Sequence, residues 1–80
     1  MDKAKELDWF NEIMKAKMLK HKEDPNENGE LTLIYWLMEE VEELRKAMKY
    51  ESRESIIKEC ADVANMAYFL ARKIKKERPR

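Results

Sequence analysis

The sequence has very few of the residues that interrupt helices or cross-link a chain. Glycine occurs once, at Gly29, and proline twice, at Pro25 and Pro79, so long stretches lack the residues that most often end a helix or start a turn. The single cysteine, Cys60, excludes a disulfide bond within the chain and fits a reducing compartment. Its apolar neighbours indicate a small core residue rather than a nucleophile.

The sequence also lacks a net charge and a long apolar run. Lysine and arginine together number 17, as do aspartate and glutamate, so no net field attracts nucleic acid or anionic lipid. No apolar run approaches the roughly 20 residues that cross a bilayer, and the first residues lack the basic-then-apolar order of a signal peptide. We therefore expect a cytoplasmic protein with neither nucleic acid nor membrane as a partner.

What the sequence does contain is apolar residues at helical spacing over most of its length. Its 80 residues, 44% hydrophobic and 42% charged, are typical of one folded domain, residues 1–80, rather than of a disordered chain. Spacings of three and four predict helices over about residues 3–22, 30–50 and 53–76. The predicted fold class is therefore all-α, a small bundle of three main helices.

Local signals refine the last two helices. Asn28 is a candidate N-cap for the second helix and Ser52 for the third. The main apolar stripe of the second helix consists of Ile34, Met38, Val41 and Met48. The third helix is apolar almost all round, which is typical of a helix in the middle of a bundle.

A domain of this size has a marginal core, because it buries only a little over half of its unfolded surface. The third helix needs cover on both sides, and a second subunit would supply it. We therefore expect homo-oligomerisation to complete the bundle, as a dimer or a dimer of dimers, with an interface that uses the third helix.

Four glutamates lie within five consecutive positions of the stretch "WLMEEVEELRKA". Glu42 has Arg45 and Lys46 at helical spacings, so it is expected to face solvent. Glu40 has almost only apolar neighbours at three, four and seven residues, and Glu43 shares that flank with Lys46 as its one nearby cation. The local sequence therefore supplies no partner for Glu40.

A second carboxylate pair occurs in "KECADVANMAYFL", where Glu59 and Asp62 lie in the apolar face of the third helix. Such carboxylates cost several kcal/mol each if they are buried, ionised and unpaired. The simplest interpretation is that Glu40 and Glu43 face Glu59 and Asp62 across a divalent cation. Oxygen ligands without cysteine or histidine favour Mg²⁺ or Mn²⁺ over zinc.

These carboxylates have two other interpretations. They can be glutamates at the rim of the bundle that pair with lysines of a neighbouring helix or subunit, and this alternative stays open. A di-iron centre would need a Glu-x-x-His motif on two helices. The chain has no such motif, and its only histidine, His21, lies among lysines near the end of the first helix.

The two acidic stretches resemble a known family. "EEVEE", followed after a short turn by "ECAD", resembles the E-E-x-x-E and E-x-x-D motifs of the all-alpha, MazG-like nucleoside triphosphate pyrophosphohydrolases, over about residues 31–72. The resemblance implies a Mg²⁺-dependent enzyme, with Mn²⁺ as a substitute, that cleaves a nucleoside triphosphate between the α and β phosphates to monophosphate and pyrophosphate. The family's metal-ligand positions fall on Glu40, Glu43, Glu59 and Asp62.

The resemblance also implies roles for other residues. Glu39 orients or deprotonates the attacking water, a role that Glu43 can share, and Asn65 contacts sugar or phosphate. The charge of the leaving pyrophosphate calls for cations. The cations nearest in the sequence are those at the end of the first helix, Lys17, Lys20, His21 and Lys22. The alternative is that this basic helix end is simply solvated.

An aromatic side chain next to the metal site would stack on the base. Trp36, one turn before Glu40, is the first candidate, although it can equally belong to the core or to a dimer interface. The sequence does not identify the base. An alternative from another class is a non-catalytic helical interaction module that docks a basic partner on its acidic face.

Overall fold

A computed structural model of the chain describes residues 2–20 and 25–78. Its elements are α1 (Lys3–Glu6), α2 (Asp8–Lys20), the short 3₁₀ helix η1 (Pro25–Glu27), α3 (Glu30–Tyr50) and α4 (Arg53–Glu77). The described residues form no strand, which confirms the predicted all-α fold class. No helix among them is both long and apolar enough to span a bilayer.

The helix boundaries follow the local sequence with two exceptions, at the N-cap of α3 and at Leu7. The Ser52 side chain accepts a hydrogen bond from the backbone N–H of Ser55 at 3.2 Å, which confirms the predicted N-cap of α4. The N-cap of α3 is Gly29, not Asn28. Asn28 instead donates its backbone N–H to the carbonyl of Pro25 in the preceding 3₁₀ turn, so it lies one residue too early. The first predicted helix is interrupted at Leu7, between α1 and α2.

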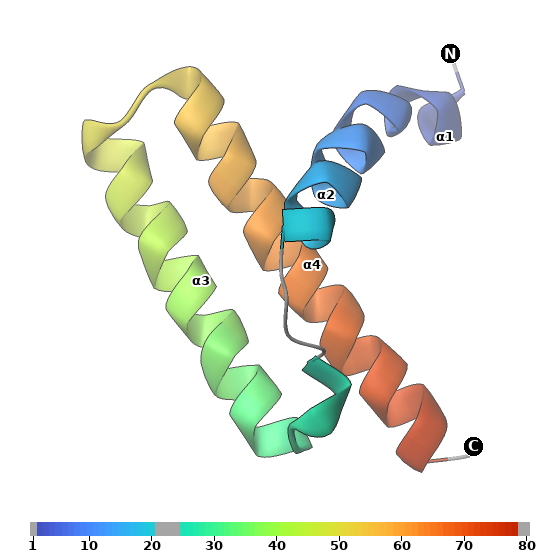
Figure 1. Cartoon of the computed structure of the whole chain (residues 1–80). Helices are drawn as coiled ribbons and strands as arrows, with labels where there is room; N and C mark the ends of the chain where they lie inside the picture. Colours follow the sequence, from blue (N-terminus) through green and yellow to red (C-terminus); the bar gives the residue numbers. More distant parts are fainter. Residues whose placement is uncertain (1, 21–24, 79–80) are drawn as a thin grey trace.

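Helices α3 and α4 form an antiparallel pair joined by a short turn, and α2 packs on α4 from the other side (Figure 1). We call α3 and α4 the hairpin, and α1 and α2 the arm. An ion pair of 2.5 Å between Arg78 and Glu30 joins the two open ends of the hairpin. Helix α4 thus contacts both α2 and α3, as predicted for the central helix.

The core of the single chain is small. Its buried residues all lie in the hairpin and comprise Leu33, Ala47, Ala61, Asn65 and Phe69. The described part of the arm has no buried residue, and its Trp9 and Leu19 side chains are exposed. The expectation that this chain needs further cover is consistent with that small core, while the homo-oligomer itself stays a prediction.

The face of α3 that contacts α4 differs from the predicted apolar stripe. Met38, Val41 and Met48 are 59%, 48% and 68% exposed, whereas Leu33 and Ala47 are fully buried. A small alanine lets the two helices approach closely, so the packed face is not the one with the largest apolar side chains. Large exposed apolar residues therefore occur mainly on α3 rather than on α4.

Candidate metal centre

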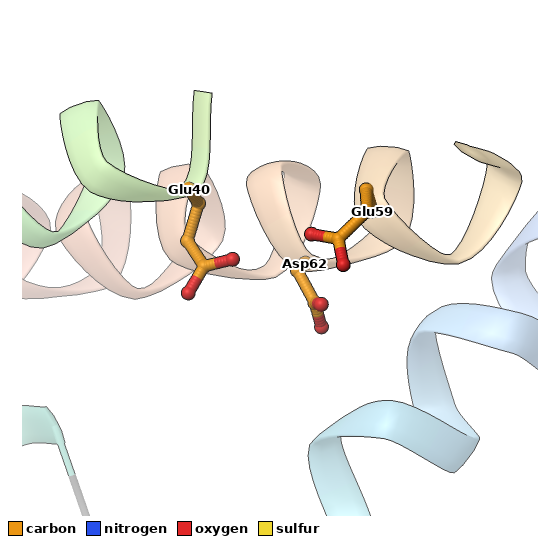
Figure 2. A group of neighbouring side chains, drawn as sticks. All are labelled: Glu40, Glu59 and Asp62. Atoms are coloured by element: carbon orange, nitrogen blue, oxygen red, sulfur yellow. The ribbon is translucent and has the colours of Figure 1, made fainter. Parts of the chain in front are cut away.

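Three carboxylates meet where α3 passes alongside α4. Glu40 comes from the middle of α3, and Glu59 and Asp62 come from adjacent turns of α4. Figure 2 shows their side chains gathered on one side of the hairpin, the side on which α2 lies. Glu40 lies seven residues after Leu33 and seven before Ala47, so it belongs to the same face of α3 as these two buried residues.

The separation of the carboxylates fits a single divalent cation. Each of Glu40, Glu59 and Asp62 offers an oxygen, and the three oxygens all lie within 4.8 Å of one another. Two oxygens that ligate the same Mg²⁺ at about 2.1 Å lie at most about 4.2 Å apart. The three oxygens are therefore spaced close to what one ion requires, and a purely oxygen donor set is the one that Mg²⁺ and Mn²⁺ prefer.

Burial and crowding change the acidity of two members of this cluster. Burial raises the pKa of Glu40 above its usual 4.5, and the charges of Asp62, Glu59 and Glu43 raise it further. The pKa of Glu59 is raised first by burial and then by the charge of Asp62. In both cases Lys17 acts in the opposite direction. The cluster therefore carries an excess of negative charge that a divalent cation would neutralise.

Lys17 enters the cluster from α2. Its Nζ lies 3.2 Å from Oδ2 of Asp62, and the two side chains are only 28% and 16% exposed. Among the described residues, Glu40 and Glu59 form no ion pair. The alternative interpretation, in which these carboxylates pair with lysines at the rim of the bundle, therefore explains Asp62. It does not explain Glu40 and Glu59, which have no cationic partner among the described residues.

The remaining glutamates of the acidic stretch differ in their surroundings. Glu42 accepts hydrogen bonds from Nε and Nη2 of Arg45, at 3.0 Å and 2.6 Å, and this contact lowers the pKa of Glu42. Its predicted role as a solvent-facing ion-pair residue is confirmed. Glu43 is exposed and lies outside the three-carboxylate group, although its charge reaches Glu40 and Glu59. Glu39 is exposed as well.

Asn65 has a structural contact that the sequence did not reveal. It is 2% exposed, and its Nδ2 donates a hydrogen bond of 3.0 Å to the carbonyl of Met14, which ties α4 to α2. Its Oδ1 is buried and has no hydrogen-bond partner among the described residues. Contact of Asn65 with sugar or phosphate stays a prediction.

The other predicted substrate residues surround the cluster to different degrees. Trp36 is partly buried one turn before Glu40, and Lys20 is exposed at the end of α2. Lys22 and His21 lie outside the described residues. No local sequence pattern predicts the contacts that Lys17 and Asn65 make between α2 and α4, because the partners are far apart in the sequence.

One comparison with known proteins gave a match. A family model described as the MazG nucleotide pyrophosphohydrolase domain matches residues 28–79, more than half of the chain. The matched region contains the hairpin and all three clustered carboxylates, and it excludes α1 and α2. Searches of curated proteins and of solved structures gave no significant match.

Proposed function

Because the chain belongs to the MazG nucleotide pyrophosphohydrolase domain family, we propose that it cleaves a nucleoside or deoxynucleoside triphosphate between the α and β phosphates. The products are the monophosphate and pyrophosphate, and the reaction depends on Mg²⁺, with Mn²⁺ as a substitute. The observation that carries the proposal is the convergence of Glu40 with Glu59 and Asp62 from the neighbouring helix. The single cysteine is consistent with the proposed cytoplasmic setting.

Glu40, Glu59 and Asp62 would hold the cation. Glu43, one turn after Glu40 and exposed, would join them by turning its side chain toward the cluster. When bound, the cation neutralises the charge of the polyphosphate and makes phosphorus accessible to in-line attack by water. Two side chains can orient that water and accept its proton, Glu39 and Glu43, because both are carboxylates next to the ligands and outside the three-oxygen group.

Lysines at the end of α2 and shortly after it in the sequence would serve the leaving pyrophosphate. Lys17, Lys20 and Lys22 would stabilise the charge of the leaving pyrophosphate. Trp36, one turn before Glu40 on α3, would stack on the base. Asn65 would contact sugar or phosphate, and its unpaired Oδ1 would accept a hydrogen bond from a sugar hydroxyl. Lys17 is the most direct candidate, because its ammonium group already lies at the carboxylates.

We also propose that the active form is a homo-oligomer, a dimer or a dimer of dimers. Support comes from the small core of the single chain and from its exposed apolar side chains, which include Trp9, Leu19, Met38 and Met48. A second subunit would cover these side chains and supply further walls for the base. Light scattering at micromolar concentration tests this directly, and a monomer would contradict it.

The activity is tested by measuring pyrophosphate release from a panel of ribonucleoside and deoxynucleoside triphosphates, with Mg²⁺, with Mn²⁺ and with chelator. We expect metal-dependent release of pyrophosphate and monophosphate in equal amounts. Release of orthophosphate instead would place the cleavage at a different bond. Absence of turnover with every nucleotide and both metals would reject the enzymatic function and favour a non-catalytic interaction module.

A further inference from the structure

Two polar contacts between α2 and α4 lie one helical turn apart on both helices. Nδ2 of Asn65 donates a hydrogen bond of 3.0 Å to the carbonyl of Met14. Nζ of Lys17 lies 3.2 Å from Oδ2 of Asp62. Met14 and Lys17 are three residues apart on α2, as their partners are on α4, and residues at this spacing are neighbours on a helix surface. The two contacts therefore require the same register of α2 against α4.

The hydrogen bond from Asn65 acts on the backbone of α2. A carbonyl oxygen has two lone pairs, so that of Met14 can accept from Asn65 in addition to accepting a bond within its own helix. Because the acceptor is a main-chain atom, the bond fixes the height and rotation of α2 rather than the position of a flexible side chain. A slip of one residue would move α2 by about 1.5 Å and turn it by about 100°. Such a slip would carry the ammonium group of Lys17 away from the carboxylates.

Asn65 has the properties of a residue that specifies how two helices pair. It is 2% exposed in the interior of α4, although asparagine is among the weaker helix formers. A buried amide also costs free energy unless it is hydrogen-bonded. In coiled coils, a single buried asparagine fixes the register of the helices at a cost in stability. The bond of Asn65 to the neighbouring helix indicates the same use here.

Open space on either side of this line of contact leaves room for other registers. One cleft, of about 210 Å³, is lined by residues of both helices that include Met14 and Tyr68. A second cleft, of about 400 Å³, is lined by residues that include Lys17 and Lys58, and the two clefts share no lining residue. No residue of α2 is buried. Interlocking side chains thus restrict the register of α2 less than they would in a close-packed interior.

We propose that Asn65 is a positioning residue, whose hydrogen bond to Met14 sets the register of α2 that holds Lys17 at the clustered carboxylates. This role rests on the proposed pyrophosphohydrolase function and adds to it a residue that acts on the metal centre through another helix. It uses Nδ2 of Asn65 and leaves Oδ1 for the proposed sugar contact. The charge of Lys17 reaches Glu40 and Glu59 as well as Asp62, so the register of α2 affects the electrostatics of the whole centre.

The affinity of the full chain for Mn²⁺, measured without nucleotide by electron paramagnetic resonance of the free ion, tests this role. Asn65→Ala should tighten Mn²⁺ binding about fivefold, as Lys17→Gln should, because either change withdraws the ammonium group that competes for Asp62. The double variant should bind no more tightly than either single variant, because both changes remove the same interaction. Asn65→Leu removes the donor with a side chain of similar branched shape and should behave like Asn65→Ala.

Leu33→Val is the control for a general loss of stability. It removes a methylene group from a fully buried side chain of α3 and leaves the hydrogen bond between α2 and α4 in place. Its Mn²⁺ affinity should equal that of the unaltered chain. The positioning role is wrong if both Asn65 variants also bind Mn²⁺ like the unaltered chain. It is equally wrong if the double variant binds about 25-fold more tightly, the product of two independent effects.

Reductive methylation of lysines, followed by mass spectrometry, reports the position of Lys17 without metal or nucleotide. The Lys17 side chain is 28% exposed and that of Lys15 is 71% exposed, so Lys17 should react more slowly in the unaltered chain. The two rates should become similar in Asn65→Ala, and unchanged protection of Lys17 would overturn the proposal. If Lys17 loses its protection in Asn65→Ala but the unaltered chain neither binds Mn²⁺ nor hydrolyses nucleotides, the positioning role stands and the proposed function is wrong.

Discussion

The hairpin and the arm of this protein differ in how deeply their side chains are buried. The hairpin contains every buried residue of the described chain and all three clustered carboxylates. The arm has no buried residue and reaches the hairpin through polar contacts such as Asn65 with Met14 and Lys17 with Asp62. A segment with few buried apolar contacts opens at a lower free energy than the core. The anionic half of the site therefore lies on the better-buried hairpin, and the cationic half lies on the less buried arm.

The largest effect should come from removing a carboxylate of the hairpin. Glu40→Gln or Asp62→Asn should lower turnover by about 100-fold or more, because each removes an anionic ligand from a site that works by charge neutralisation. Glu42→Gln is the matched control from the same stretch, since Glu42 contacts only Arg45 on the surface. It should change turnover by less than about twofold and stability by less than about 1 kcal/mol.

These variants are compared by pyrophosphate release and by chemical unfolding. An equal loss of activity in all three would remove the distinction between the clustered carboxylates and the surface glutamate.

The next largest effect should come from the arm, at Lys17. Lys17→Gln removes a cation that competes for Asp62, so Mn²⁺ should bind about fivefold more tightly, roughly the 1 kcal/mol of a partly exposed ion pair. Turnover should nevertheless fall, because the same ammonium group is proposed to hold the leaving phosphates. Electron paramagnetic resonance of free Mn²⁺ measures the affinity. Lys15→Gln, which removes an exposed lysine of α2 paired with Glu12, should leave it unchanged.

A smaller effect is expected at the hydrogen bond that ties the arm to the hairpin. Asn65→Ala removes the donor to the Met14 carbonyl and should lower the free energy of unfolding by about 1–2 kcal/mol. Asn11→Ala, an exposed change on α2, should have little effect. Urea denaturation compares the two variants, and equal stabilities would mean that this contact does not hold the arm.

The smallest effect concerns the pH dependence of stability without metal. The pKa of Glu40 and of Glu59 is raised in the folded chain, so the folded form binds more protons than the unfolded form above about pH 4.5. The unfolding free energy contributed by these groups therefore falls as the pH rises through that window. Thermal unfolding in chelator should show a shallower fall for Glu40→Gln than for the unaltered chain.

Added Mg²⁺ should oppose this fall, because it binds the ionised carboxylates of the folded chain. A Glu40→Gln profile parallel to that of the unaltered chain would show that Glu40 keeps its ordinary acidity.

Sequence reasoning succeeded where the relevant signal is local or where two motifs occur together. The caps and periodicities defined α3 and α4 closely, with the N-cap of α3 misplaced by one residue at Asn28. The apolar neighbours of Glu40 correctly marked it as partly buried, and the Arg45 spacing correctly marked Glu42 as exposed. Sequence reasoning failed at the face of α3 that packs on α4. It assigned the large side chains of Met38 and Met48 to that face, whereas the structure buries the small Ala47 there and leaves both methionines exposed.

The sequence by itself determined the two helices of the hairpin, the two acidic motifs and, through them, membership of a nucleotide pyrophosphohydrolase family. These features depend on residues within a turn or two of one another, where helical geometry fixes the outcome. Only the tertiary structure decided that Lys17 reaches Asp62, that Asn65 holds Met14, and that Lys58 shares a cleft with α2. Those pairings depend on the angle and depth at which α2 docks on α4, and that docking is set by side-chain packing and charge summed over both helices rather than by any local pattern.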